Sequence, residues 1–433
     1  MPINGDESVQ MTNDTAREFG PLWHPDGRRL LYNVERNDYL QIDLAYLDGR
    51  GPVQVTRGEG SYELIDVSPD GSRIYYTSWE KRSDISSVNV ETGEETEIAA
   101  GLETELWPEV SPDGKALVYQ MNGSPNPTAN LNESILVVKA FGGETTQVLH
   151  KGSNPHWLPD SRRFAFLRWH EAEQADQLWI LNTVNGQETQ VTTDGVRSPS
   201  IGLMPIARAD IGEFDFSPDG GRLVYLDSKR PKNVRMISTG SSESANLTNN
   251  NSLNLLYSSP LFSPSGEEIV FVSTEKFPDK RQLPRWRVML FQDGRSKEIF
   301  STTSSVRLVG WSPSGKDVFV ETTDGPMKIG PLDVNIVQIS LTGKSKAVAS
   351  LQDVHADTMT LAVDGATVAF VARRSDKDDV WIMSLDSGRN RKITNNGNTR
   401  IFFASLAWSP DSKTIYFDSQ EQINTISMFE NFK

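Results

Sequence analysis

A short phrase recurs nine times along this chain of 433 residues, and its period constrains the fold more than any other feature. The clearest copy is Ser68-Pro69-Asp70-Gly71. The third residues of the nine copies are Pro25, Pro69, Pro112, Pro159, Pro218, Pro264, Pro313, Val363 and Pro410. Successive copies are 43 to 50 residues apart, except for one gap of 59. Four-stranded propeller blades repeat about every 40–50 residues, so the period favours that fold.

Each phrase is a hairpin signal. Proline sets the backbone at the second turn position, and aspartate and glycine suit the third and fourth. A strand-forming run such as 117–119 follows at once, and two more strands follow it with turn signals between them. The fourth strand often ends in threonine, as at Thr56, Thr192, Thr248 and Thr394. Four strands per unit correspond to one propeller blade.

The two ends of the chain indicate how the ring closes. The ninth unit has a first strand, a second strand at 415–417 and a third at 423–428, and then the sequence stops. Residues 9–13 have the pattern of a fourth strand and precede the first phrase. We therefore predict one all-β domain over residues 1–433, a propeller of nine four-stranded blades in which strand 9–13 completes the last blade. Eight blades, or an open ring, is the alternative.

Composition excludes several classes of function. The net charge is −15, and nucleic-acid binding needs a basic surface. The chain has no cysteine, so a disulfide, a thiolate nucleophile and a cysteine-ligated zinc are excluded. No apolar run approaches ~18 residues, so we expect no membrane insertion. The first eight residues do not resemble a signal peptide.

The repeated phrase resembles a known family. Ser-Pro-Asp-Gly-x-x-Ile-x-Tyr, with Trp or Val before it and Leu-Thr closing the unit, is similar to the TolB-like (WD40-like) propeller repeat. The likeness is closest at Ser68–Gly71, Ser111–Gly114 and Ser217–Gly220. TolB itself carries an α/β domain before its propeller. No helical or βαβ pattern precedes the repeat here, so we expect a bacterial relative and not TolB itself.

The resemblance implies several roles. TolB-like propellers serve as protein-binding platforms in the bacterial envelope, which implies a periplasmic or extracytoplasmic location if a leader has been removed. Similar propellers are sensor domains of kinases and regulators, or precede the hydrolase domain of prolyl-oligopeptidase-like peptidases. A further relative is an oligogalacturonate lyase.

No catalytic residue is evident in the sequence. A peptidase of that type needs a Gly-x-Ser-x-Gly elbow in a hydrolase domain, and neither is encoded. We therefore expect a monomeric, non-enzymatic scaffold that presents a propeller face or channel mouth to a protein or peptide. The alternatives are a carbohydrate-active enzyme of the oligogalacturonate-lyase-like type, and a sensor domain.

The repeat predicts a ligand site in the central channel. His156 precedes the turn phrase of the fourth unit, and the matching positions of other units hold Asp66, Glu109 and Asp215. Because innermost strands line the channel, these side chains can hold a divalent cation, or they can make ordinary interstrand hydrogen bonds. Apart from this cation we expect no cofactor. The residues that enter the same strands, near one channel mouth, are Glu63, Glu105, Glu213, Arg307 and Asp357.

Two further sets of residues stand out. Trp23, Trp157, Trp311 and Trp408 occupy the apolar position before the turn, and we expect them to wedge between blades. The segment 275–287 carries five basic residues on an acidic protein, namely Lys276, Lys280, Arg281, Arg285 and Arg287. It is either a contact site or a solvated hairpin tip.

Overall fold

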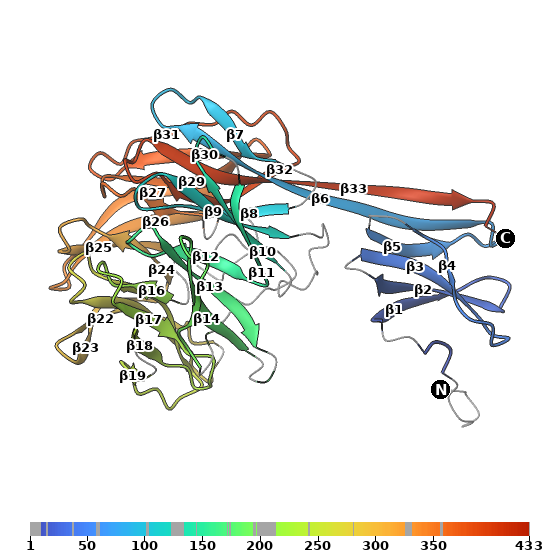
Figure 1. The fold of residues 1–433 in the computed structure, drawn as a ribbon, viewed down its shortest axis with the longest axis horizontal. Coiled ribbons are helices and arrows are strands. Elements are labelled where there is room, and N and C mark those ends of the chain that lie inside the picture. Colours follow the sequence, from blue (N-terminus) through green and yellow to red (C-terminus); the bar gives the residue numbers. More distant parts are fainter. Residues whose placement is uncertain are drawn as a thin grey trace.

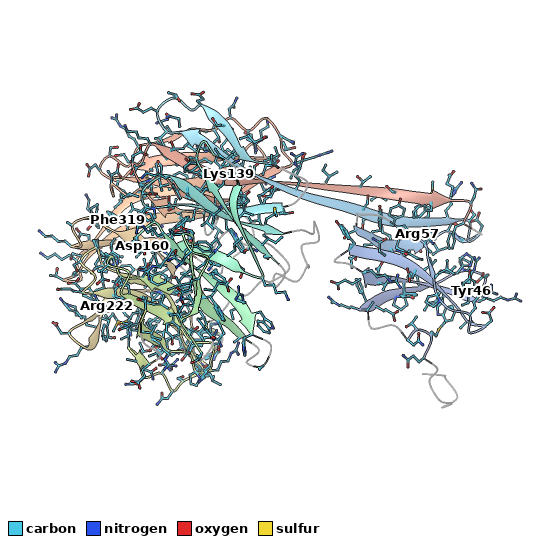
Figure 2. The ribbon with its side chains drawn as sticks, in the orientation of Figure 1. Tyr46, Arg57, Lys139, Asp160, Arg222 and Phe319 are labelled. Atoms are coloured by element: carbon cyan, nitrogen blue, oxygen red, sulfur yellow. The ribbon has the colours of Figure 1, made fainter. Side chains whose placement is uncertain are left out.

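A computed structural model shows a chain built from β-strands in two separate parts (Figure 1). It describes residues 10–13, 16–36, 39–57, 61–100, 104–122, 134–143, 145–170, 172, 175–193, 196, 214–240, 243–279, 281–324, 331–355 and 358–432. No helix of this described part is long and apolar enough to cross a membrane. A large body holds most strands, and a smaller outboard module lies beside it. Figure 2 shows Tyr46 and Arg57 in the outboard module, and Lys139 and Asp160 in the body.

Six sets of antiparallel strands in the body follow one another in chain order. The first two are β8 (Thr104–Val110), β9 (Ala116–Asn122), β10 (Ile135–Ala140), β11 (Thr145–His150), then β12 (Ser153–Trp157), β13 (Arg163–His170), β14 (Ala175–Asn182), β15 (Glu188–Gln190). The next two are β16 (Phe214–Phe216), β17 (Arg222–Leu226), β18 (Val234–Ser238), β19 (Ser244–Asn246), then β20 (Leu255–Phe262), β21 (Ile269–Glu275), β22 (Arg285–Gln292), β23 (Arg295–Thr302). The last two are β24 (Ser305–Trp311), β25 (Asp317–Thr323), β26 (Pro331–Ser340), β27 (Ser345–His355), then β28 (Thr360–Leu361), β29 (Thr367–Arg374), β30 (Lys377–Ser384), β31 (Asn390–Lys392).

A seventh set combines strands from distant parts of the chain. It runs β32 (Ile401–Trp408), β33 (Thr414–Glu430), β6 (Arg73–Asn89), β7 (Glu95–Ala99). The prediction that strand 9–13 pairs with 423–428 is wrong: residues 10–13 form no strand, and β6 pairs with 423–428 instead. The physical reason is that 73–83 contains no glycine or proline, so β6 continues as one strand and fills that position.

The outboard module is a two-sheet sandwich. One sheet is β1 (Glu18–Trp23), β2 (Arg29–Arg36), β3 (Tyr39–Tyr46) and β4 (Val53–Gln54). The other is β5 (Ser61–Val67) with the first half of β6 and the last half of β33. Leu31, Ile42, Leu64 and Ile74 are buried between the two sheets, with Phe429 packed against them. Nine separate blades are therefore not formed, because the second and ninth units share strands and the first unit lies outboard.

Neighbouring sheets of the body bury apolar side chains against each other. Trp157, Trp311 and Trp408 each lie in such a cluster, as the sequence predicts for wedges between blades. Trp23 does not: its side chain is 58% exposed, because its strand β1 lies in the outboard module. Apolar clusters also join β32 and β33 to β29 and β30 on one side, and β33 and β6 to β9 and β10 on the other.

The turn phrases of the third to ninth units touch one another in order. Glycine at the fourth turn position sits against the proline of the preceding phrase: Gly220 on Pro159, Gly266 on Pro218, Gly315 on Pro264 and Gly365 on Pro313. Gly114 of the third phrase sits against Pro410 of the ninth. Where serine replaces glycine, its hydroxyl accepts an amide N–H of the preceding phrase, from Asp113 to Ser161 and from Asp364 to Ser412. The first two phrases meet separately in the outboard module, where His24 Nε2 lies 3.0 Å from the carbonyl oxygen of Gly71.

Hydrogen bonds explain the turn aspartates and the recurring threonine. The Ser68 hydroxyl donates to Asp70 and holds the pKa of that carboxyl below its ordinary value. The Thr192 hydroxyl donates to the Gln177 side chain at 3.1 Å and accepts the Leu178 N–H at 2.9 Å, which fixes the fourth strand of the unit to the third. The same pair of bonds recurs at Thr56, Thr248 and Thr394.

Replacing Thr192 with valine is expected to lower the free energy of unfolding by about 1–3 kcal/mol, because a buried amide and a buried side-chain oxygen lose their partner. Chemical denaturation measures the change. Thr189→Val is the matched control, since Thr189 is exposed on β15 of the same sheet. An equal effect of the two substitutions would contradict this role.

Gly365→Ala is expected to cost more stability than Gly27→Ala. Both glycines have positive φ (64° and 68°), so both variants carry similar backbone strain, about 1 kcal/mol. A Cβ at Gly365 would lie 2.1 Å from Pro313 Cδ, whereas a Cβ at Gly27 meets nothing within 4 Å. The difference between the two melting temperatures therefore measures the contact between neighbouring turns. A difference near zero would show that these turns do not support each other.

Candidate functional site

Three of the predicted channel residues lie on neighbouring sheets of the body. Glu109 on β8, His156 on β12 and Asp215 on β16 occupy the same register position, opposite Val118, Ala165 and Val224 of the next strand. His156 Nδ1 lies 3.2 Å from Glu109 Oε1. The structure thus brings residues of this group onto neighbouring sheets, and their role in a channel site stays a prediction.

Both carboxylates of the group also bond to the neighbouring sheet. Glu109 Oε1 accepts the Trp157 N–H at 3.2 Å, and Asp215 Oδ2 accepts the Phe262 N–H at 2.7 Å. The carbonyl oxygen of Glu109 accepts the indole N–H of Trp157 at 3.2 Å. The sequence left ordinary interstrand hydrogen bonds as the alternative to cation binding. These contacts are of that kind, except that they join strands of neighbouring sheets.

His156 packs against the two aromatic residues that flank Asp215 in the sequence. The His156 ring lies edge-on to Phe214 and stacks on Phe216, with ring centres 5.9 and 6.3 Å apart. Burial raises the pKa of Asp215 to about 6, against the opposing effects of the His156 charge and of two backbone amides. A carboxyl with such a pKa changes charge in mildly acidic solution.

The other predicted residues do not join this group. Asp66 and Glu63 lie exposed on β5 of the outboard module, and Asp66 accepts the N–H of Val67. Glu105 is buried on β8, and Arg307 pairs with Glu321 of the adjacent strand at 3.0 Å. Glu213 and Asp357 lie outside the described residues. Asp66 was placed wrongly because its unit does not belong to the body.

The donor set does not fit a divalent cation well. Glu109 and Asp215 each give one oxygen to a backbone amide. Among the residues that the structure describes, no three His, Asp or Glu side chains come together as ligands for a metal ion. Structural geometry for such ions demands several oxygen or nitrogen donors around one point.

Sequence reasoning missed a second polar group in the body. The carboxylate of Asp378 is fully buried and lies 2.9 Å from His355 Nε2 and 3.5 Å from Arg373 Nη1. The three residues lie at the ends of β27, β29 and β30, away from the turn phrase. The repeat therefore gives no signal for them, and only the pairing of strand ends brings them together.

Asp215→Asn is expected to gain stability over the unaltered chain as pH rises from 4 to 6. The folded carboxyl keeps its proton up to about pH 6, whereas the unfolded one ionises near 4, so ionisation favours unfolding in this window. The gain reaches about 2–3 kcal/mol above pH 6, at 1.36 kcal/mol per pKa unit. Denaturant melts at several pH values measure it.

Asp219→Asn is the control with the opposite sign. Its carboxyl accepts the Ser217 hydroxyl and has a lowered pKa, so its stabilising effect is present at neutral pH and is lost on acidification. A pH-independent difference for Asp215→Asn would show that this carboxyl titrates normally.

Comparisons with known proteins give one family match and two sequence relatives. Residues 9–128 match the family described as "Dipeptidyl peptidase IV (DPP IV) N-terminal region". "Uncharacterized protein Atu1656" of Agrobacterium fabrum is 30% identical over 190 residues, covering 40% of this chain and 62% of that protein. "Dipeptidyl-peptidase 5" of Porphyromonas gingivalis is 22% identical over 365 residues, covering 82% of this chain and 44% of that protein. The chain thus spans less than two thirds of either relative.

Among solved structures, "Oligogalacturonate lyase in complex with manganese" matches with a TM-score of 0.53 and 11% identity. The match covers 84% of this chain and 97% of that one. At this identity the likeness concerns the fold alone. A second structure, "The beta-propeller domain of the Trilobed protease from Pyrococcus furiosus reveals an open velcro topology", matches with a TM-score of 0.50 and 13% identity, and covers 70% of this chain and 88% of that one. This match supports the β-propeller expected from the repeat, whereas closure of the ring and a closer relation to TolB stay predictions.

Proposed function

We propose that this chain is a non-enzymatic binding scaffold for a protein or peptide partner, with a propeller ring of seven blades as its body. Two sets of contacts support the ring. Every pair of successive sheets buries an apolar cluster, and the set β32–β33–β6–β7 contacts both β28–β31 and β8–β11. The turn phrases make the same circuit, because Gly114 of the third unit meets Pro410 of the ninth.

One observation carries the scaffold proposal: the open edge of β33 in the outboard module. From 423 to 430, β33 pairs with β6 on one side, and no described strand pairs with its other edge. Ile426 and Met428 on this edge strand are 75% and 40% exposed. Residues 422–429 carry no charge. An uncharged apolar edge is the type of surface to which a partner adds an extended strand.

The group formed by Glu109, His156 and Asp215 fits a structural role better than a catalytic one. An enzyme of the carbohydrate-active type would use His156, Glu109 and Asp215 on its substrate. Two of these side chains hold neighbouring sheets together through backbone amides instead. The resemblance to envelope propellers supports a location outside the cytoplasm, in the periplasm, where the scaffold would meet its partner.

The double substitution Ile426→Lys with Met428→Lys is expected to reduce partner capture at least tenfold. Two lysines protect an exposed strand edge from pairing. Tagged full-length protein is mixed with bacterial envelope extract, and the captured protein is identified and purified for titration. On binding, backbone amides of 423–430 are expected to become protected from hydrogen exchange.

Val184→Lys is the matched control, because Val184 is equally exposed (75%) but lies on a turn of the body. Full capture by the double variant would show that the partner binds a surface other than the β33 edge. The proposal would be overturned if the chain captures no partner. It would also be overturned if sedimentation shows a dimer in which a second copy occupies the β33 edge.

A further inference from the structure

A pocket of about 580 Å³ opens over one face of the sheet β20–β23. Its volume lies in the range of pockets that hold small ligands. The lining residues are Leu247, Thr248, Asn249, Leu255, Tyr257, Phe271, Ser273, Arg285, Arg287, Met289, Ser296 and Glu298. We call it the Arg285 pocket.

The pocket exists because two neighbouring sheets differ in length. Strands β17 and β18 have five residues each, whereas β21 has seven and β22 has eight. The two sheets are aligned at their turn phrases, where Gly266 touches Pro218. The longer sheet therefore extends by two to three residues, or ~7–10 Å, beyond the shorter one. Near the turns its face is covered by an apolar cluster, and beyond that it is open.

Charged side chains occupy the uncovered part of this face. Glu298 of β23 pairs with Arg285 at 3.2 Å and with Arg287 at 3.3 Å, and Arg287 also pairs with Glu275. Arg287 is thus held between two carboxylates. Arg285 bonds only through Nη2, to Glu298 and Ser301, and its side chain is 47% exposed. Its Nε and Nη1 donors are not used by any described residue, so Arg285 can bind a second anion.

The loops beside the pocket add positive charge. Lys229 and Arg230 are exposed in the loop after β17, and Lys276 is exposed directly after β21. None of these three forms an ion pair within the described chain. Asn250 connects the first loop to the pocket wall, because its side-chain amide donates to the carbonyl oxygens of Lys232 and Leu255. A basic surface of this kind on a protein of net charge −15 attracts anions locally.

We propose that the Arg285 pocket binds a small organic anion with a carboxylate head and an apolar body. The carboxylate accepts a hydrogen bond from one of the free donors of Arg285, Nε or Nη1, and the charge on the guanidinium strengthens this bond. The apolar body lies against Leu255, Phe271 and Met289, beside the Tyr257 ring. This site is separate from the β33 edge and does not depend on the scaffold proposal.

Three probes of the same shape test the proposal on the full chain: 4-phenylbutyrate, its neutral amide and the corresponding amine. Calorimetric titration is expected to show binding of the carboxylate, at least tenfold weaker binding of the amide, and none of the amine. Added salt weakens the carboxylate binding, because the surrounding cations are exposed. Equal binding of all three probes, or no binding of the carboxylate, would overturn the proposal.

Two variants then locate the site. Arg285→Gln is expected to weaken carboxylate binding about fivefold, the upper range for an exposed ion pair. Ser296→Trp, an exposed position of the lining, is expected to abolish binding by filling the pocket without changing charge. Arg162→Gln removes a charge from a distant turn phrase and should leave affinity unchanged. Wild-type affinity in both pocket variants would show that the ligand binds elsewhere. Partner capture through β33 is a separate measurement, so the two proposals can fail independently.

Discussion

The pairing of β6 with β33 is the interaction on which both parts of the molecule depend. Seventeen residues of each strand, 73–89 and 414–430, are paired along their whole length. At ~3.4 Å per residue this ladder is about 58 Å long. Its one half supplies the two central strands of the set β32–β33–β6–β7, and its other half supplies two of the three strands that cover the sheet β1–β4. Figure 1 shows the two long strands running from the body to the outboard module.

The β6–β33 ladder also contains a buried carboxyl group, whose burial would be unfavourable without hydrogen-bond partners. Asp418 of β33 is fully buried, and burial raises the pKa of its carboxyl. It accepts the backbone N–H and the hydroxyl of Ser405 and the side-chain amide of Gln420. Because the two strands are more than 300 residues apart, their pairing closes a long loop and must form late relative to the local hairpins. The hairpins made by single units can form first, since each joins residues close in sequence.

The repeat in the sequence predicts the strands, the hairpin turns and the β-propeller, because each unit contains its own turn chemistry. It does not predict how the second and ninth units combine. Residues 414–430 contain neither glycine nor proline, and the same is true of residues 73–83. The absence of these turn-forming residues is the sequence signal for one long strand in place of two. The expected strands 415–417 and 423–428 are thus parts of β33. The alignment of units grouped Glu109, His156 and Asp215, which lie on neighbouring sheets, but it also included Asp66, whose unit folds in the outboard module.

Departures from the repeat explain the surfaces that a regular propeller would lack. A regular unit covers the face of its neighbour, whereas the short strands β17 and β18 leave the charged half of β22 open. A separate ninth blade would take its last strand from the other terminus, whereas the run-on strand β33 projects from the body and ends with one edge unpaired in the described chain. Both features follow from strand length alone: too few residues in one unit, and no turn within another. The recurring geometry of the turns keeps neighbouring sheets aligned, so that strand length can vary at the opposite ends without disturbing the core.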